Sequence, residues 1–117
     1  MKYSIITDFE CKEAPSAQKY KEMFEQDVDM VIVLTSSLRL SDSYSNAVEG
    51  RHLVISELKK MGLQRKNIFV LDAGSIVEIG NQLYAKALEL CENNPDFSDI
   101  CLKLMFFKNS MLAPVFA

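Results

Sequence analysis

Glycine, proline and cysteine are all scarce in this sequence of 117 residues, and it contains no long hydrophobic run. With 4 glycines, 3 prolines and 49% hydrophobic residues, the composition excludes a disordered, collagen-like or low-complexity chain. The length fits a single domain over residues 1–117. Cys11, Cys91 and Cys101 are odd in number and form no C-x-x-C pair, so we expect reduced thiols in a cytoplasmic protein. We expect neither a signal peptide nor a membrane span.

Positive charge does not predominate, since 13 Lys and Arg stand against 16 Asp and Glu and the formal net charge is −3. Because binding a phosphate backbone requires clustered Lys and Arg, we expect no nucleic-acid partner. The sequence lacks the glycine-rich nucleotide motifs and the G-x-S-x-G motif of hydrolases, and its cysteines and single histidine lack metal-ligand spacing. We therefore expect no cofactor, no metal site and no enzymatic activity. His52 is expected on the surface or between helices.

Apolar segments alternate with amphipathic segments along the chain. Unbroken apolar runs predict buried strands over residues 3–7, 29–34 and 68–71. Helical periodicity predicts helices that begin near residues 16, 41, 75 and 98, with Tyr20 on the apolar inner face of the first and Gly62 as the stop of the second. Ser98 is the expected cap of the last helix, which is predicted to end at Phe107. This order predicts an α/β fold, with an open parallel sheet of three or more strands and helices on both faces.

The carboxyl ends of the predicted strands are the expected place for a ligand, as in other open α/β sheets. Six of the eleven residues from 35 to 45 are Ser or Thr, and they run into a helix start. Hydroxyls and free main-chain N–H groups at such a position can hold a carboxylate or a phosphate. Alternatively, these side chains only cap the helix and bond within their own loop. For Asp8 and Asp72, which end two other strands, capping or loop hydrogen bonding is favoured over acid–base chemistry.

The hydroxyl-rich loop resembles the signature of the DegV family, approximately T-x-S-S-x-L-S-G-[ST]-Y-x-x-A. The residues that fall in register are Thr35, Ser37, Leu40, Ser41, Ser43, Tyr44 and Ala47. Upstream, Ala14-Pro15-Ser16 is similar to the end of the family's T-S-Q-P-S segment. The resemblance implies a fold like the N-terminal lobe of DegV proteins and a lipid-binding function.

The resemblance also implies roles for individual residues and a protein partner. Ser37 and Ser16 would contact the carboxylate of a fatty acid or a similar small lipid, with Thr35, Ser41 and Ser43 supporting them. A fatty-acid kinase would be the partner that converts the bound acid into an acyl phosphate.

Two departures from the signature favour a second hypothesis. Leu38 stands where the family has its second serine, and Asp42 replaces the glycine. The chain would then be a degenerate DegV-like interaction module without ligand binding. A segment before Pro15 and the family's C-terminal domain have no counterpart in this sequence. The apolar residues 104–107 and 111–117 are predicted to pack against a second copy of the chain, or against ligand, in place of that domain.

Overall fold

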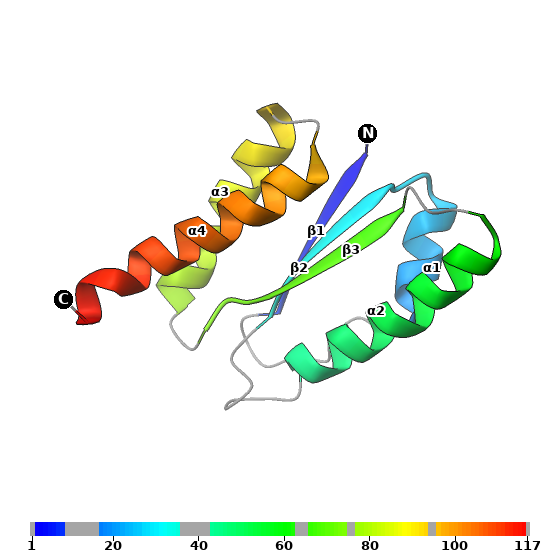
Figure 1. The fold of residues 1–117 in the computed structure, drawn as a ribbon, viewed down its shortest axis with the longest axis horizontal. Helices are drawn as coiled ribbons and strands as arrows, with labels where there is room; N and C mark the ends of the chain where they lie inside the picture. The colour runs from blue at the N-terminus through cyan, green and yellow to red at the C-terminus, as the bar shows by residue number, and fades with distance from the viewer. Residues whose placement is uncertain are drawn as a thin grey trace.

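Three parallel strands form the sheet at the centre of the protein, in the order β1-β2-β3 (Figure 1). The structure is a computed structural model, and it describes residues 2–8, 17–35, 43–62, 66–74, 77–93 and 96–116. The strands are β1 (Tyr3–Asp8), β2 (Met30–Thr35) and β3 (Asn67–Asp72). The helices are α1 (Ala17–Glu25), α2 (Ser43–Lys60), α3 (Val77–Asn93) and α4 (Phe97–Phe116). The predicted open parallel α/β sheet is therefore confirmed.

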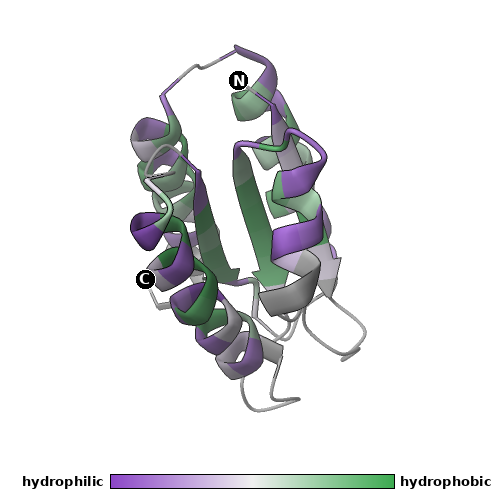
Figure 2. Cartoon of the chain, turned by 90° about the vertical axis from the view of Figure 1, so that its right-hand side faces the viewer, coloured by the Kyte–Doolittle hydropathy of each residue, from purple (hydrophilic) through white to green (hydrophobic). Residues whose placement is uncertain are grey.

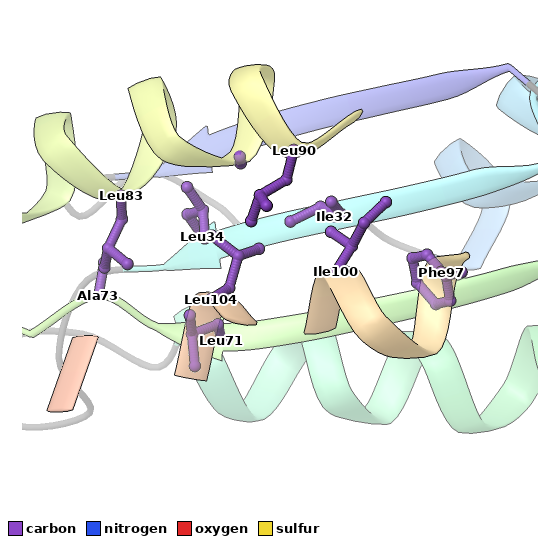
Figure 3. Close-up of a cluster of buried hydrophobic side chains, with 10 residues drawn as sticks. Ile32, Leu34, Leu71, Ala73, Leu83, Leu90, Phe97, Ile100 and Leu104 are labelled. Carbon is purple, nitrogen blue, oxygen red and sulfur yellow. The ribbon is translucent and has the colours of Figure 1, made fainter. Parts of the chain in front are cut away.

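Two apolar clusters hold the helices to opposite faces of the sheet, as Figure 2 shows from the side. On one face, Tyr20 and Phe24 of α1 and Val54 of α2 pack against the sheet. On the other face, Leu83 of α3 and Leu104 of α4 pack against it (Figure 3). Every residue of β2 after Met30 is buried, because helices cover both of its faces.

The connections explain which face each helix covers. The chain advances across the sheet in one direction, from β1 to β2 to β3, and both connections are expected to be right-handed crossovers. Two such crossovers place their helices, α1 and α2, on the same face of the sheet. After β3 the chain passes to the opposite face, where α3 packs over β1 and β2. The chain then continues into α4, which packs beside α3 on its β3 side (Figure 3).

The observed helix ends confirm one sequence prediction and correct another. Gly62 follows α2 with a φ of 75°, and its N–H donates to the Lys59 carbonyl at 3.2 Å, so it ends the helix as expected. The predicted cap of the last helix is wrong. Asp96 fills this role, since its Oδ1 accepts the N–H of Ser98 at 3.1 Å.

The last helix is also longer than predicted, because α4 continues past Phe107 to Phe116. Residues 108–111 contain no glycine or proline that would stop it there. Among the described residues, no helix combines the length and apolar character needed to cross a membrane.

Candidate functional site

Thr35 lies at the carboxyl end of β2, in the middle of a row of three strand ends. Its register partners are Asp8 of β1 and Asp72 of β3. Thr35 is 0% exposed, and apart from Tyr20, whose hydroxyl is hydrogen-bonded, no other buried residue in the described part of the chain has a polar side chain. Its Oγ1 has no hydrogen-bond partner among the described residues. Since a buried hydroxyl without a partner costs about 1–3 kcal/mol, this atom marks a position where a polar ligand group would be favoured.

The main chain around Thr35 is held firmly by the segment that follows β3. The Thr35 carbonyl accepts the N–H of Ala73 at 2.7 Å, which extends the pairing one residue beyond the strand. The next N–H, of Gly74, donates to Oδ1 of Asp72 at 2.7 Å, and Gly74 has a φ of 82°. Asp72 therefore bonds within its loop, as the sequence analysis favoured. The position of Thr35 is fixed by these bonds, while its hydroxyl stays unpaired within the described structure.

The side chain of Thr35 lies on the face of the sheet that α1 and α2 cover. Side chains alternate between the two faces of a strand, so Thr35 shares its face with Val31 and Val33. Both valines belong to the cluster formed with α1 and α2. The hydroxyl is therefore on the same side of the sheet as the start of α2, which lies near the carboxyl ends of the strands (Figure 1).

Two hydrogen bonds fix α2 relative to its neighbours. The Tyr20 hydroxyl donates to the Ala47 carbonyl at 3.3 Å and is fully buried, and burial raises the pKa of Tyr20 to about 12. Nε of Arg51 donates to the Ile68 carbonyl of β3 at 2.6 Å. These bonds tie α2 to α1 and to the sheet, so the start of α2 is held in place relative to Thr35. The sequence predicts Tyr20 only as part of the apolar core and predicts no role for Arg51.

The N-terminus of α2 supplies the second element of the site. The first main-chain N–H groups of a helix have no partner within the helix, and the helix dipole favours negative charge near them. The first turn of α2 contains no acidic residue that would neutralise this end. A buried hydroxyl and a helix N-terminus on one side of the sheet form an arrangement suited to an anionic group.

The structure describes only part of the predicted set of ligand-binding residues. Thr35 is described in full and lies at the strand end as expected. Ser43 is the first residue of α2, but its side chain lies outside the described part of the structure. Ser16, Ser37 and Ser41 also lie outside the described residues. The contacts predicted for these four side chains therefore remain predictions.

A hollow of about 300 Å³ lies near the opposite end of α2 and is separate from this site. Its apolar lining includes Phe24 and Leu58, and Leu58 is about 22 Å along the helix from Ser43. Two charged residues of its lining pair with each other, with Nζ of Lys21 2.8 Å from the Glu57 carboxylate. Thr35, the one predicted ligand-binding residue whose side chain the structure describes, does not line this hollow.

The described residues contain no group of three His, Cys, Asp or Glu side chains that could hold a metal ion. His52 is exposed on α2, which agrees with the expected surface position.

A three-stranded parallel sheet with a polar position at its carboxyl edge defines an α/β protein of the kind that binds ligands at strand ends. The sequence profile described as "Uncharacterised protein, DegV family" matches residues 9–115. The chain belongs to the DegV family. No curated protein matches it.

Solved structures of DegV proteins share the fold. A DegV family protein from Eubacterium eligens, loaded with heptadecanoic acid, is 18% identical with a TM-score of 0.66, and the match covers 83% of this chain and 33% of that one. A DegV lipid-binding protein from Thermotoga maritima is 26% identical with a TM-score of 0.55, and the match covers 84% of this chain and 33% of that one. A stearic-acid-binding protein from Eubacterium ventriosum is 25% identical with a TM-score of 0.55, with 78% and 30% covered. The chain thus spans about a third of the length of these proteins.

Proposed function

We propose that this chain binds the carboxylate of a fatty acid, or of a similar small lipid, at the carboxyl end of β2. The observation that carries the proposal is the buried Thr35 Oγ1, which has no partner in the described part of the protein. Family membership and the lipids bound by solved relatives support this ligand class. In the proposed complex, the Thr35 hydroxyl donates a hydrogen bond to a carboxylate oxygen.

The remaining contacts of the proposed site come from the hydroxyl-rich loop and the start of α2. Ser37 and Ser16 contact the carboxylate, and Ser41 and Ser43 support them. The free N–H groups of the first turn of α2 add donors and a favourable dipole. The acyl chain gains affinity by leaving water, at about 0.8 kcal/mol for each buried CH₂ group.

Native mass spectrometry of the freshly purified chain tests this proposal. We expect a co-purifying adduct with the mass of a lipid, and binding of added palmitate or oleate. Ser37→Ala and Thr35→Val should each weaken the adduct, while Thr7→Val should leave it unchanged because Thr7 is an exposed residue of a neighbouring strand. A spectrum without adducts, together with no thermal shift from either fatty acid, would refute fatty-acid binding.

We further propose that the chain acts in the cytoplasm and presents its bound acid to a fatty-acid kinase. Free Cys91 and Cys101 are compatible with a reducing compartment. The chain itself carries out no catalysis in this proposal. Incubation of the palmitate-loaded chain with such a kinase and ATP should give acyl phosphate, whereas kinase and palmitate without the chain should not.

The alternative is an interaction module of DegV ancestry that no longer binds a ligand. Leu38 and Asp42 in the signature favour it, because one removes a hydroxyl and the other adds a negative charge near a bound anion. The exposed Met105 and Phe106 of α4 would then serve protein contacts. The mass-spectrometric experiment separates the two functions, since the module predicts no lipid adduct.

A further inference from the structure

The outer edge of β1 has no neighbouring strand among the described residues, since β1 pairs only with β2. Its sequence, Tyr3 to Asp8, carries no charge before its last residue and no proline, so the strand lacks two of the sequence features that commonly protect an exposed edge. Its apolar side chains are only half-buried, whereas those of β2 are buried. The edge is therefore suitable for pairing with another strand.

The hydrogen-bond pattern identifies which main-chain groups face this edge. The Lys2 carbonyl accepts the N–H of Met30, so the even-numbered residues of β1 direct their main-chain groups toward β2. Successive residues alternate in this direction, and the N–H and C=O groups of Ile5 and Thr7 therefore face outward. No described strand pairs with these groups.

The order of the described elements also leaves space for a further strand beside the outer edge of β1. A right-handed crossover from β3 through α3 would place a following strand beside β1. Instead the chain turns back into α4, which packs beside α3. The helix that would cover an added strand is thus in place, while the described residues provide no such strand.

One flank of α3 presents apolar side chains above the β1 edge. Lys86 lies on the flank toward α4, with its Nζ 5.6 Å from the centre of the Phe107 ring. Tyr84 and Leu88 are each two residues from Lys86 and so lie about 160° around the helix, on the side away from α4. Both are exposed, and this side of α3 faces the outer edge of β1 (Figure 3).

We propose that the β1 edge and this flank of α3 bind a second copy of the same chain through antiparallel pairing of the two β1 strands. A twofold axis perpendicular to the sheet at Ile5 makes Ile5 of both copies a hydrogen-bonded pair, because its main-chain groups face outward. In this register Lys2 of each copy stands opposite Asp8 of the partner copy. The register thus sets a lysine position against an aspartate position at both ends of the paired strands.

The same axis brings the two α3 helices to a normal packing distance. Because α3 contacts both β1 and β2, it lies over their boundary, about half a strand spacing inside the edge. The two helix axes are then two strand spacings apart, about 10 Å, and packed helices are typically 8–10 Å apart. Tyr84 and Leu88 of both copies fill the space between the helices. A second copy would thus pair the outward main-chain groups of β1 and at the same time bury the exposed apolar side chains of α3.

Analytical ultracentrifugation of the full chain, from low micromolar to submillimolar concentration, tests the proposed dimer. The expected mass rises from 13.3 kDa toward twice this value as the concentration increases. Thr7→Pro removes an outward N–H and no bond to β2, although its ring also restricts φ, and it should weaken the dimer about tenfold or more. Thr7→Val keeps this N–H and should not weaken the dimer. Leu88→Lys should weaken the dimer to a similar degree through the α3 flank.

Phe106→Lys serves as the matched control, because Phe106 is an exposed apolar residue of α4 on the same face of the sheet. We expect it to leave the dimer intact. A monomer at all concentrations would overturn the proposal. A dimer broken by Phe106→Lys but not by Leu88→Lys or Thr7→Pro would also overturn it, and would place the contact at the C-terminal helix. Circular dichroism of each variant identifies those that fail to fold, and Leu88→Lys tests the interface without altering the sheet.

Discussion

Replacing Thr35 by Val should make the ligand-free protein more stable and its fatty-acid complex weaker. Val has the shape of Thr and the same preference for strands, so the change removes the hydroxyl and little else. In the free protein this hydroxyl is buried without a partner in the described structure, and such a group costs about 1–3 kcal/mol. The free energy of unfolding should therefore rise by about this amount, which raises the Tm by about 4 °C for each kcal/mol in a protein of this size.

The complex should respond in the opposite direction. A hydrogen bond to a charged group contributes about 1.5–3 kcal/mol, so the Kd for palmitate should rise roughly 10- to 150-fold. Thermal unfolding with and without palmitate measures both effects in one assay. Thr7→Val at the exposed β1 edge should change neither quantity by more than about 0.5 kcal/mol.

Thr35→Val is expected to raise the stability of the free protein and to lower its affinity for palmitate. If Thr35→Val lowered the stability of the free protein, the hydroxyl would be making a stabilising hydrogen bond before any ligand binds. If stability rose and palmitate binding stayed the same, Thr35 would be buried for another reason and the carboxylate would bind elsewhere. Thr35→Ser provides a further check, because it keeps the hydroxyl and should retain binding.

Three further predictions concern the structure outside the site. Asp96→Ala should lower the free energy of unfolding by about 1 kcal/mol in urea titrations, whereas Ser98→Ala should have little effect, because Asp96 accepts the N–H bond at the start of α4. The N–H of Lys2 donates to Asp29 and holds the pKa of Asp29 below its usual 3.8, so its contribution to stability is present above that pH and is lost as the pH falls through the lowered pKa. Asp29→Asn should therefore show a weaker loss of stability in acid, and an unchanged pH profile would contradict this assignment. Burial raises the pKa of Cys101 to about 11, so at pH 8 it should react with a disulfide reagent about a hundredfold more slowly than an ordinary thiol, measured against Cys101→Ser.

The strands could be predicted from the sequence because their signal is local. The run from Met30 to Leu34 is apolar at every position, which indicates a strand covered on both faces whatever the rest of the chain does. The end of α2 was also predictable, since Gly62 adopts the left-handed conformation that few other residues accept.

The first residue of α4 could not be predicted from the local sequence. Asp96 and Ser98 are both good capping residues and lie two positions apart, so the sequence offers two starts of similar strength. Packing decides between them, because a start at Phe97 buries Phe97, Ile100 and Leu104 against the sheet. The helical periodicity of apolar residues predicts an end of α4 at Phe107, but the structure shows that α4 extends to Phe116.

The sequence by itself determined the order of strands and helices, the parallel sheet and the hydroxyl-rich segment after β2, because each follows from neighbouring residues along the chain. The tertiary structure decided that Thr35 is buried with an unpaired hydroxyl, since burial depends on α1 and α2 closing over one face of the sheet. It also decided that no strand of the described residues covers the β1 edge beside the apolar flank of α3, because the path of the chain after β3 is set by packing between distant segments.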